Sequence, residues 1–375
     1  MNAEYIQDET ALRRLCQQMR GAPWIALDTE FLRSRTYYAH LCLIQVATPD
    51  VVACVDPLVH DLDIDPLLNL IHSPKILKVF HSARQDLEVF HDLRQVAPQP
   101  LFDTQIAAAL AGYDDQIGYA ALVESITGVK LAKQHTRTDW KARPLTPEQI
   151  RYAEDDVRHL REVYVYLAER LSALGRKEWL EEECAALADP ALYRNEPEQA
   201  YRRIRQGHLL PPEAQTVLSE LAAWRENTAQ KKNLPRSWVM ADAALLEVAR
   251  TAPGNLEQLA EMKGVSIGNA SKWGPQILEA VRAGQNMPPR RLWNGSRPLD
   301  RHQQALYARM AARVRQVAQE QKIHPGMIAR RKDIQELILD GDSGPLARGW
   351  RRRLVGEELR SMRNASRIPE PVRAG

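Results

Sequence analysis

The sequence lacks the features that mark membrane and secreted proteins. It has no run of about 18 apolar residues, so no transmembrane helix is predicted. Its first residues do not show the basic-then-apolar layout of a signal peptide. The 4 cysteines are scattered, which fits neither a disulfide framework nor a zinc site. These absences predict a protein of the reducing cytoplasm.

A strong net charge is also lacking, but the net value of +3 conceals two halves of opposite sign. Residues 1–200 contain 21 lysines and arginines against 31 aspartates and glutamates, whereas residues 201–375 contain 30 against 17. An acidic half joined to a basic half suggests that the basic half binds a polyanion. The alternative is that surface charge simply drifts along the chain.

The basic half is itself uneven. Residues 210–290 are nearly neutral, whereas residues 291–375 carry a net charge of +9. Two basic triplets lie in this last segment, Arg330-Arg331-Lys332 and Arg351-Arg352-Arg353. We therefore expect phosphate contacts mainly in the last segment, although a solvated face with local ion pairs would explain any single arginine equally well.

The first half of the chain alternates strand-like and helix-like patterns. The predicted strands are 23–28, 40–47, 51–55 and 76–80, and the predicted helices are 9–20, 83–95, 103–112, 117–127 and 147–173. This alternation predicts an α/β domain with a largely buried sheet.

After residue 174 the pattern is helical throughout. Proline and glycine divide it at Leu210-Pro211-Pro212 and between Met287 and Pro298. A faint internal repeat at an offset of 89 residues aligns Ala229, Gln230 and Leu234 with Ala318, Gln319 and Ile323. The repeat predicts two tandem helical modules of about 80 residues each.

Asp28 and Glu30 close the apolar run Trp24-Ile25-Ala26-Leu27. Successive side chains of a strand alternate between its two faces, so these two carboxylates point the same way. Neighbouring acids repel each other and are costly to bury unless a positive charge lies between them. A divalent metal ion satisfies this requirement, although many edge strands also end in solvated acids.

The helix predicted at 83–95 places a third acid on an apolar face. Ala83, Leu87, Phe90 and Leu93 form a stripe at helical spacing, and Asp86 falls near its middle. A carboxylate in that position must be paired, hydrogen-bonded or metal-bound. The alternative to a metal site is a salt bridge, with Arg84 or with a distant arginine.

The helix predicted at 147–173 supplies a fourth acid. Thr146 and Gln149 form the pattern of a capping box at its start. Of the three consecutive acids 154–156, helical phase places Asp156 at the border of the apolar face, with Tyr152 one turn before it on the same side. The alternative is that Asp156 pairs or caps at a domain boundary.

Four carboxylates therefore point into one α/β domain, without a cysteine or histidine cluster beside them. This ligand set favours Mg²⁺ or Mn²⁺ over zinc. It is sufficient for two ions about 4 Å apart, the arrangement that cleaves phosphodiesters.

The chain resembles the DEDD superfamily of exonucleases in three motifs that follow in order. They are Asp28-Thr29-Glu30, His81-Ser82-Ala83-Arg84-Gln85-Asp86-Leu87 and Tyr152-x-x-x-Asp156, and the tyrosine in the third resembles the tyrosine branch. Phe102-Asp103-Thr104 is similar to the segment that follows the second motif. The tandem modules resemble HRDC domains, and the complete layout is similar to that of the bacterial ribonuclease D family.

This resemblance implies a fold and a domain organisation. Residues 1–200 would form a ribonuclease-H-like exonuclease domain with a mixed sheet and a helical linker. Two all-α HRDC domains would follow at 210–290 and 296–375, the second matching its family pattern less well because it has no equivalent of Lys263-Gly264-Val265. One chain would supply every part, so a monomer suffices.

The resemblance also implies a chemistry. Asp28 would hold both metal ions, Glu30 and Asp156 the ion that activates water, and Asp86 the second ion. Tyr152 would orient the attacking water. The activity would be hydrolytic removal of nucleotides from RNA 3′ ends as nucleoside 5′-monophosphates, with precursor tRNA and other structured RNAs as expected substrates.

Two other functions remain open at this point. A DNA 3′–5′ exonuclease would use the same metals, since only contacts to a 2′-hydroxyl separate the two substrates. A catalytically inactive RNA-binding scaffold would be expected to have lost some of the acids, whereas all four are present.

Overall fold

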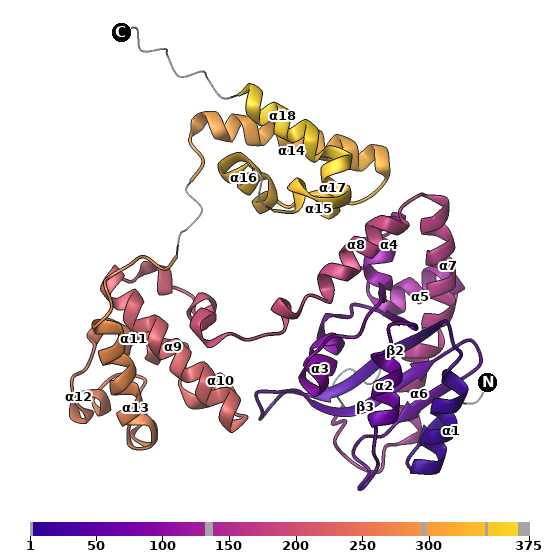
Figure 1. The fold of residues 1–375 in the computed structure, drawn as a ribbon, viewed down its shortest axis with the longest axis horizontal. Coiled ribbons are helices and arrows are strands. Elements are labelled where there is room, and N and C mark those ends of the chain that lie inside the picture. Colours follow the sequence, from indigo (N-terminus) through magenta and orange to yellow (C-terminus); the bar gives the residue numbers. More distant parts are fainter. Residues whose placement is uncertain (1–2, 132–137, 294–297, 342–343, 367–375) are drawn as a thin grey trace. The chain divides into compact units, whose positions relative to one another are not determined.

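The computed structural model describes residues 3–131, 138–293, 298–341 and 344–366 (Figure 1). It divides into two compact units. The first unit comprises residues 1–31, 41–192 and 298–375, and the second comprises residues 32–40 and 193–297. The expected linker residues Gly295-Ser296-Arg297 lie outside the described residues.

The first unit is built on a six-stranded mixed sheet with the strand order β1-β4-β3-β2-β5-β6. The strands are β1 (Glu4–Ile6), β2 (Trp24–Leu32), β3 (His40–Ala47), β4 (Val52–Val55), β5 (Leu77–Phe80) and β6 (Leu101–Asp103). β1 pairs in parallel with β4, β5 in parallel with β2, and β6 in parallel with β5, whereas β3 and β4 are antiparallel. The first half of β2, nearly all of β3 and all of β4 are buried on both faces, in agreement with the predicted largely buried sheet.

Helices surround this sheet. They are α1 (Glu9–Met19), α2 (Asp65–Ile71), α3 (Arg84–Arg94), α4 (Thr104–Ala111), α5 (Tyr119–Thr127), α6 (Pro147–Arg158), α7 (Leu160–Ala173) and α8 (Lys177–Leu187), followed by the short η1 (Pro190–Leu192). The predicted capping box of α6 is present: Thr146 accepts a hydrogen bond from the Gln149 N–H, and the Gln149 side chain accepts one from the Thr146 N–H. This box fixes where α6 begins.

The single helix predicted at 147–173 is wrong in one respect, because it breaks at His159 into α6 and α7. The Tyr119 hydroxyl donates to the Asp155 carbonyl at 2.9 Å, and Arg161 Nε donates to the Arg158 carbonyl at 3.2 Å. These side chains satisfy carbonyl groups at the end of α6 that would otherwise lack partners. The break therefore depends on a side chain from α5, which helical periodicity alone does not reveal.

Two other differences from the predicted elements remain. The short elements β1, β6 and α2 were not predicted, because none of them shows a clear strand or helix periodicity in the sequence. The predicted stripe of α3 is correct at Ala83, Leu87 and Phe90 but wrong at Leu93, which is 45% exposed. Leu93 lies in the last turn, beyond the part of α3 that the rest of the unit covers.

The second unit contains the first helical module. Its elements are η2 (Pro197–Arg203), η3 (Gly207–Leu209), α9 (Pro212–Lys232), α10 (Arg236–Val239), α11 (Asp242–Thr251), α12 (Leu256–Ala260) and α13 (Ile267–Gln285). The buried core lies between α9, α11 and α13 and includes Leu218, Leu221, Leu245 and Ile277.

The second helical module belongs to the first unit. Its elements are α14 (Arg301–Gln321), α15 (Pro325–Ile328), α16 (Arg331–Asp340), η4 (Pro345–Ala347), α17 (Gly349–Arg351), the π-helical turn η5 (Arg352–Gly356) and α18 (Glu357–Ala365). No strand follows residue 174 in the part of the chain that the structure describes, as predicted.

The first three helices of the two modules repeat each other. α9 and α14 have 21 residues each, α10 and α15 have 4, and α11 and α16 have 10. All three pairs of helices start 89 residues apart. Asn233 and Lys322, also 89 residues apart, cap α9 and α14 in the left-handed conformation. After the third helix the two modules differ.

Two further observations concern the cysteines and the length of the helices. All 4 cysteines are buried and free. Among the described residues, no helix combines the length and the apolar character that crossing a membrane requires.

Candidate active site

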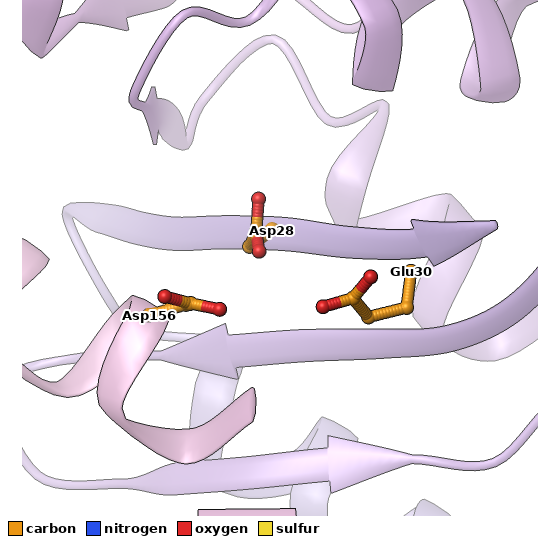
Figure 2. Close-up of side chains that lie close together, drawn as sticks. All are labelled: Asp28, Glu30 and Asp156. Carbon is orange, nitrogen blue, oxygen red and sulfur yellow. The ribbon is translucent and has the colours of Figure 1, made fainter. Parts of the chain in front are cut away.

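Three of the predicted acids converge at the end of β2 and on α6. Asp28 and Glu30 come from β2, and Asp156 comes from α6 (Figure 2). Each of the three contributes one carboxylate oxygen, and these oxygens all lie within 4.8 Å of one another. The strand period places the first two on one face, and the capped start of α6 sets the phase of the third.

Asp86 lies beside this group but is held differently. It is 7% exposed on α3, and its Oδ1 accepts a hydrogen bond of 2.5 Å from the Thr29 hydroxyl. No ion pair of Asp86 is found among the described residues, so the salt bridge considered above is not formed with Arg84. Thr29 stands between the two acids of β2, and its hydroxyl therefore links that strand to α3.

Asp28, Glu30 and Asp156 line a cavity of about 250 Å³. Tyr152 lines the same cavity, so the structure brings it to the acids as predicted from its place one turn before Asp156. Its ring lies 6.1 Å from that of Trp140, which is buried in the loop before α6. The cavity is therefore acidic at its base and aromatic at its side.

Arg143 anchors the loop that carries Trp140. Its guanidinium donates to both carboxylate oxygens of Asp56 at 2.6 and 2.7 Å, to the Trp140 carbonyl at 2.7 Å and to the Cys42 carbonyl at 2.7 Å. Burial opposes ionisation of Asp56, but the hydrogen bonds from Arg143 and Tyr5 lower its pKa overall. A bidentate pair of this kind fixes orientation as well as position, so the wall of the cavity beside Tyr152 is held in place.

The acids of the site resist ionisation together. Burial, with repulsion from Asp156 and Asp86, raises the pKa of Glu30 to about 8. Burial, with repulsion from the other three acids, raises the pKa of Asp28 well above its usual range. The pKa of Asp156 rises to about 7 through burial and its acidic neighbours. For Asp86, burial raises the pKa to about 7 although the Thr29 hydrogen bond lowers it.

Two further side chains of the cavity were not predicted as site residues. Tyr119, at the start of α5, and His81, after β5, both line it. His81 Nδ1 lies 3.0 Å from the Thr104 hydroxyl, while its Nε2 has no hydrogen-bond partner among the described residues. Burial lowers the pKa of His81 although Asp103 raises it. His81 could have been predicted from its place in the second motif, whereas no pattern in the sequence indicates Tyr119.

The donor set fits a divalent cation. The described part of the chain pairs none of these four acids with a lysine or arginine. Burial is the main cause of their raised pKa values, and repulsion from neighbouring acids adds to it for Asp28, Glu30 and Asp156. Carboxylate oxygens are the ligands that Mg²⁺ and Mn²⁺ prefer. A cation among them would offset the repulsion and return the carboxyls to their ionised state.

Comparison with known families divides the chain in the same way. Residues 3–172 match the 3′-5′ exonuclease family, and residues 214–281 match the HRDC domain family. The first match contains all four acids and both tyrosines of the site.

Similar proteins extend over nearly the whole chain. A ribonuclease D of Gluconacetobacter diazotrophicus is 42% identical over 359 residues, which cover 94% of this chain and 91% of that protein. A ribonuclease D of Nitrobacter hamburgensis is 38% identical over 365 residues, covering 96% and 95%. The crystal structure of Escherichia coli RNase D, described as an exoribonuclease involved in structured RNA processing, superposes with a TM-score of 0.87 at 33% identity, covering 97% of this chain and 99% of that one.

Proposed function

The chain belongs to the ribonuclease D family of 3′–5′ exoribonucleases, and from that premise we propose that it hydrolyses RNA from the 3′ end and releases nucleoside 5′-monophosphates. The observation that carries this proposal is the convergence of Asp28, Glu30 and Asp156 in one cavity, with Asp86 beside them and Tyr152 in its wall. Among the described residues, no other group of three acids brings its carboxylate oxygens within 4.8 Å of one another.

The four acids would hold two divalent cations, Mg²⁺ or Mn²⁺. Repulsion from each of the other three acids adds to the effect of burial on the pKa of Asp28, and we assign this residue to both cations. Glu30 and Asp156 are assigned to the first, and Asp86 to the second. When bound, such cations lower the pKa of water and stabilise charge on the entering and leaving oxygens of a phosphodiester.

Tyr152 is assigned to positioning rather than to proton removal. Burial, with repulsion from the acids, raises the pKa of its hydroxyl above the usual value of about 10. A hydroxyl that stays protonated at neutral pH is a poor general base but a good hydrogen-bond partner. We therefore assign it the role of orienting the attacking water, with the ring held by its contact to Trp140.

We also propose that the second helical module, residues 296–375, is an HRDC domain like the first at 210–290. The support is the repeat of three helix lengths and three helix starts between the modules. The different elements after α16 account for its weaker sequence pattern.

The substrates would be precursor tRNA and other structured RNAs in the cytoplasm, and a single chain would suffice. The net charge of +9 in residues 291–375 supports contact with an RNA backbone, because phosphate contacts come mainly from lysine and arginine.

The test uses 3′-labelled RNA and DNA of one sequence, with Mg²⁺ or Mn²⁺, and compares the wild-type protein with Asp28→Asn. The expected result is metal-dependent release of mononucleotides from RNA, much slower release from DNA, and loss of both in the variant. Glu169→Gln is the control, since Glu169 is an exposed acid of α7 that does not line the cavity.

Equal rates on RNA and DNA would instead identify a general 3′–5′ exonuclease. Absence of cleavage with every metal, while salt-sensitive RNA binding is retained, would identify an RNA-binding scaffold.

A further inference from the structure

A groove of about 740 Å³ lies within the first unit, between α8 and the second helical module. Its walls come from the C-terminal half of α8, the start of α16 and the turn that precedes α17. None of its lining residues belongs to the catalytic cavity. We refer to it as the α8 groove.

Aromatic and ionic contacts hold the walls of the α8 groove together. The Trp350 ring is 1% exposed and stacks on Trp179 of α8, with centroids 4.4 Å apart and planes at 12°. Trp350 Nε1 donates to Glu183 at 2.8 Å, and Arg351 Nη2 donates to the other oxygen of Glu183 at 3.0 Å. A buried stack joined to a charge-assisted pair makes this a fixed contact.

The backbone also approaches α8 closely at Gly349. This residue has φ of +59°, and a Cβ there would lie 1.8 Å from a carboxylate oxygen of Glu182. The same carboxylate accepts a hydrogen bond from the Trp350 N–H at 2.8 Å and pairs with Arg353 at 2.9 Å. Only glycine satisfies both the conformation and the space.

The acids of the groove are already engaged. Glu182 and Glu183 have the partners just described. Asp333 accepts a hydrogen bond from the Arg330 N–H at 2.7 Å, and Asp189 accepts one from the Ala191 N–H at 2.9 Å. Glu182 and Glu183 are therefore paired with arginines, whereas Asp189 and Asp333 cap main-chain N–H groups and keep their negative charge.

Three cations of the groove are not engaged in this way. Arg330, Lys332 and Arg348 line it and are exposed. None of their side chains forms an ion pair within the described ranges of the chain. Within the described chain, these three cations face two acids without a cationic partner, Asp189 and Asp333, so a small excess of positive charge is available to a ligand.

We propose that the α8 groove binds backbone phosphates of the RNA substrate at nucleotides that do not enter the catalytic cavity. This inference rests on the proposed exoribonuclease function. A small phosphate ion would be expected at a free helix N-terminus or a nest of N–H groups. The N-terminus of α16 is instead closed by Asp333, so long side chains on separate segments remain, which suit an extended polyanion.

The test removes these three charges together, as Arg330→Gln, Lys332→Gln and Arg348→Gln. The matched control removes three exposed charges from α14 of the same module, as Arg301→Gln, Arg309→Gln and Arg315→Gln. Both triple variants have the same net charge, so a difference between them reports position rather than total charge. Binding is measured on the Asp28→Asn background, with a long single-stranded RNA, as a function of salt concentration.

The groove variant should bind this RNA about tenfold more weakly than the control near 0.1 M salt. The slope of log Kobs against log salt should fall by about 2, since each lost contact to a single strand removes about 0.7. When Asp28 is intact, the groove variant should have a lower kcat/KM for the long RNA, because KM rises while kcat stays the same. For an RNA of three nucleotides it should stay unchanged, because so short a chain does not reach beyond the cavity.

Equal slopes for the two triple variants would overturn the proposal. A small-anion site would also overturn it. In that case the salt slope of the groove variant would stay at the wild-type value, while inorganic phosphate, at matched ionic strength, would stabilise the wild-type protein but not the groove variant. Restoring the charges as Arg330→Lys, Lys332→Arg and Arg348→Lys should restore the slope. Failure of the wild-type protein to degrade any RNA would instead reject the proposed function.

Discussion

The candidate active site and the α8 groove each contain four carboxylates, and they differ in what those carboxylates contact. In the active site, Asp28, Glu30 and Asp156 approach within 4.8 Å of one another without a cationic partner among the described residues. In the groove, acids such as Glu183 are bound by arginine side chains or main-chain N–H groups. The first arrangement leaves negative charge for a metal ion, and the second leaves positive charge for a phosphate. The partners of the acids, rather than their number, determine which ligand a site favours.

The same chemical change at the two sites should have very different effects on catalysis. Asp156→Asn should lower kcat by more than about 100-fold, because even groups outside a ligand set cost about 10- to 100-fold when removed. Glu183→Gln in the groove should leave cleavage of a three-nucleotide RNA within about twofold. Single-turnover release of labelled mononucleotide measures both. A large loss in Glu183→Gln on the short substrate would contradict the separation of the two sites.

A smaller loss of kcat is expected for a substitution that affects only the orientation of the attacking water. Tyr152→Phe keeps the ring and its contact to Trp140 but removes the hydroxyl, and should lower kcat by about 10- to 100-fold with KM little changed. Tyr166→Phe, on an exposed tyrosine of α7, is the control. If kcat of Tyr152→Phe equalled that of the wild-type protein, the hydroxyl would have no role in positioning.

In the α8 groove, a substitution at Gly349 should affect stability rather than catalysis. Gly349→Ala should lower the free energy of unfolding by about 1–3 kcal/mol, because φ is positive and the new methyl group meets Glu182. Thermal unfolding followed by tryptophan fluorescence detects it, since Trp350 and Trp179 stack at this contact. Gly128→Ala shares the positive φ but has open space around it, so the difference between the two variants isolates the close contact.

Of the two sites, only the active site should make the stability of the protein depend on pH. The pKa values of Glu30, Asp86 and Asp156 are about 7 to 8 in the fold, against about 4 when unfolded. The metal-free folded state then binds more protons than the unfolded state between these values, so its stability falls as pH rises from about 4 to about 8.

The melting temperature of the metal-free protein should therefore drop from pH 5 to pH 8, and Mg²⁺ should restore it at pH 8. Asp156→Asn should flatten this slope, whereas Glu183→Gln should leave it unchanged. A melting temperature that rises with pH in the metal-free protein would show that the fold does not raise the pKa values of these acids.

Local patterns in the sequence predicted much of this site. The strand period placed Asp28 and Glu30 together, helical phase selected Asp86 and Asp156, and the capping box set the start of α6. These predictions depend only on residues within one or two turns, where backbone geometry fixes the direction of each side chain. The offset of 89 residues likewise predicted the matching helices of the two modules.

Contacts between distant segments were decided by the tertiary structure alone. The sequence did not indicate that Thr29 holds Asp86, that Tyr119 reaches the end of α6, or that the basic end of the chain would form a groove with α8. Whether a charged side chain is paired or available depends on partners that lie more than 100 residues away, as Glu183 and Arg351 do. Periodicity and composition describe the charge that a segment carries, but only the fold determines which of those charges neutralise each other.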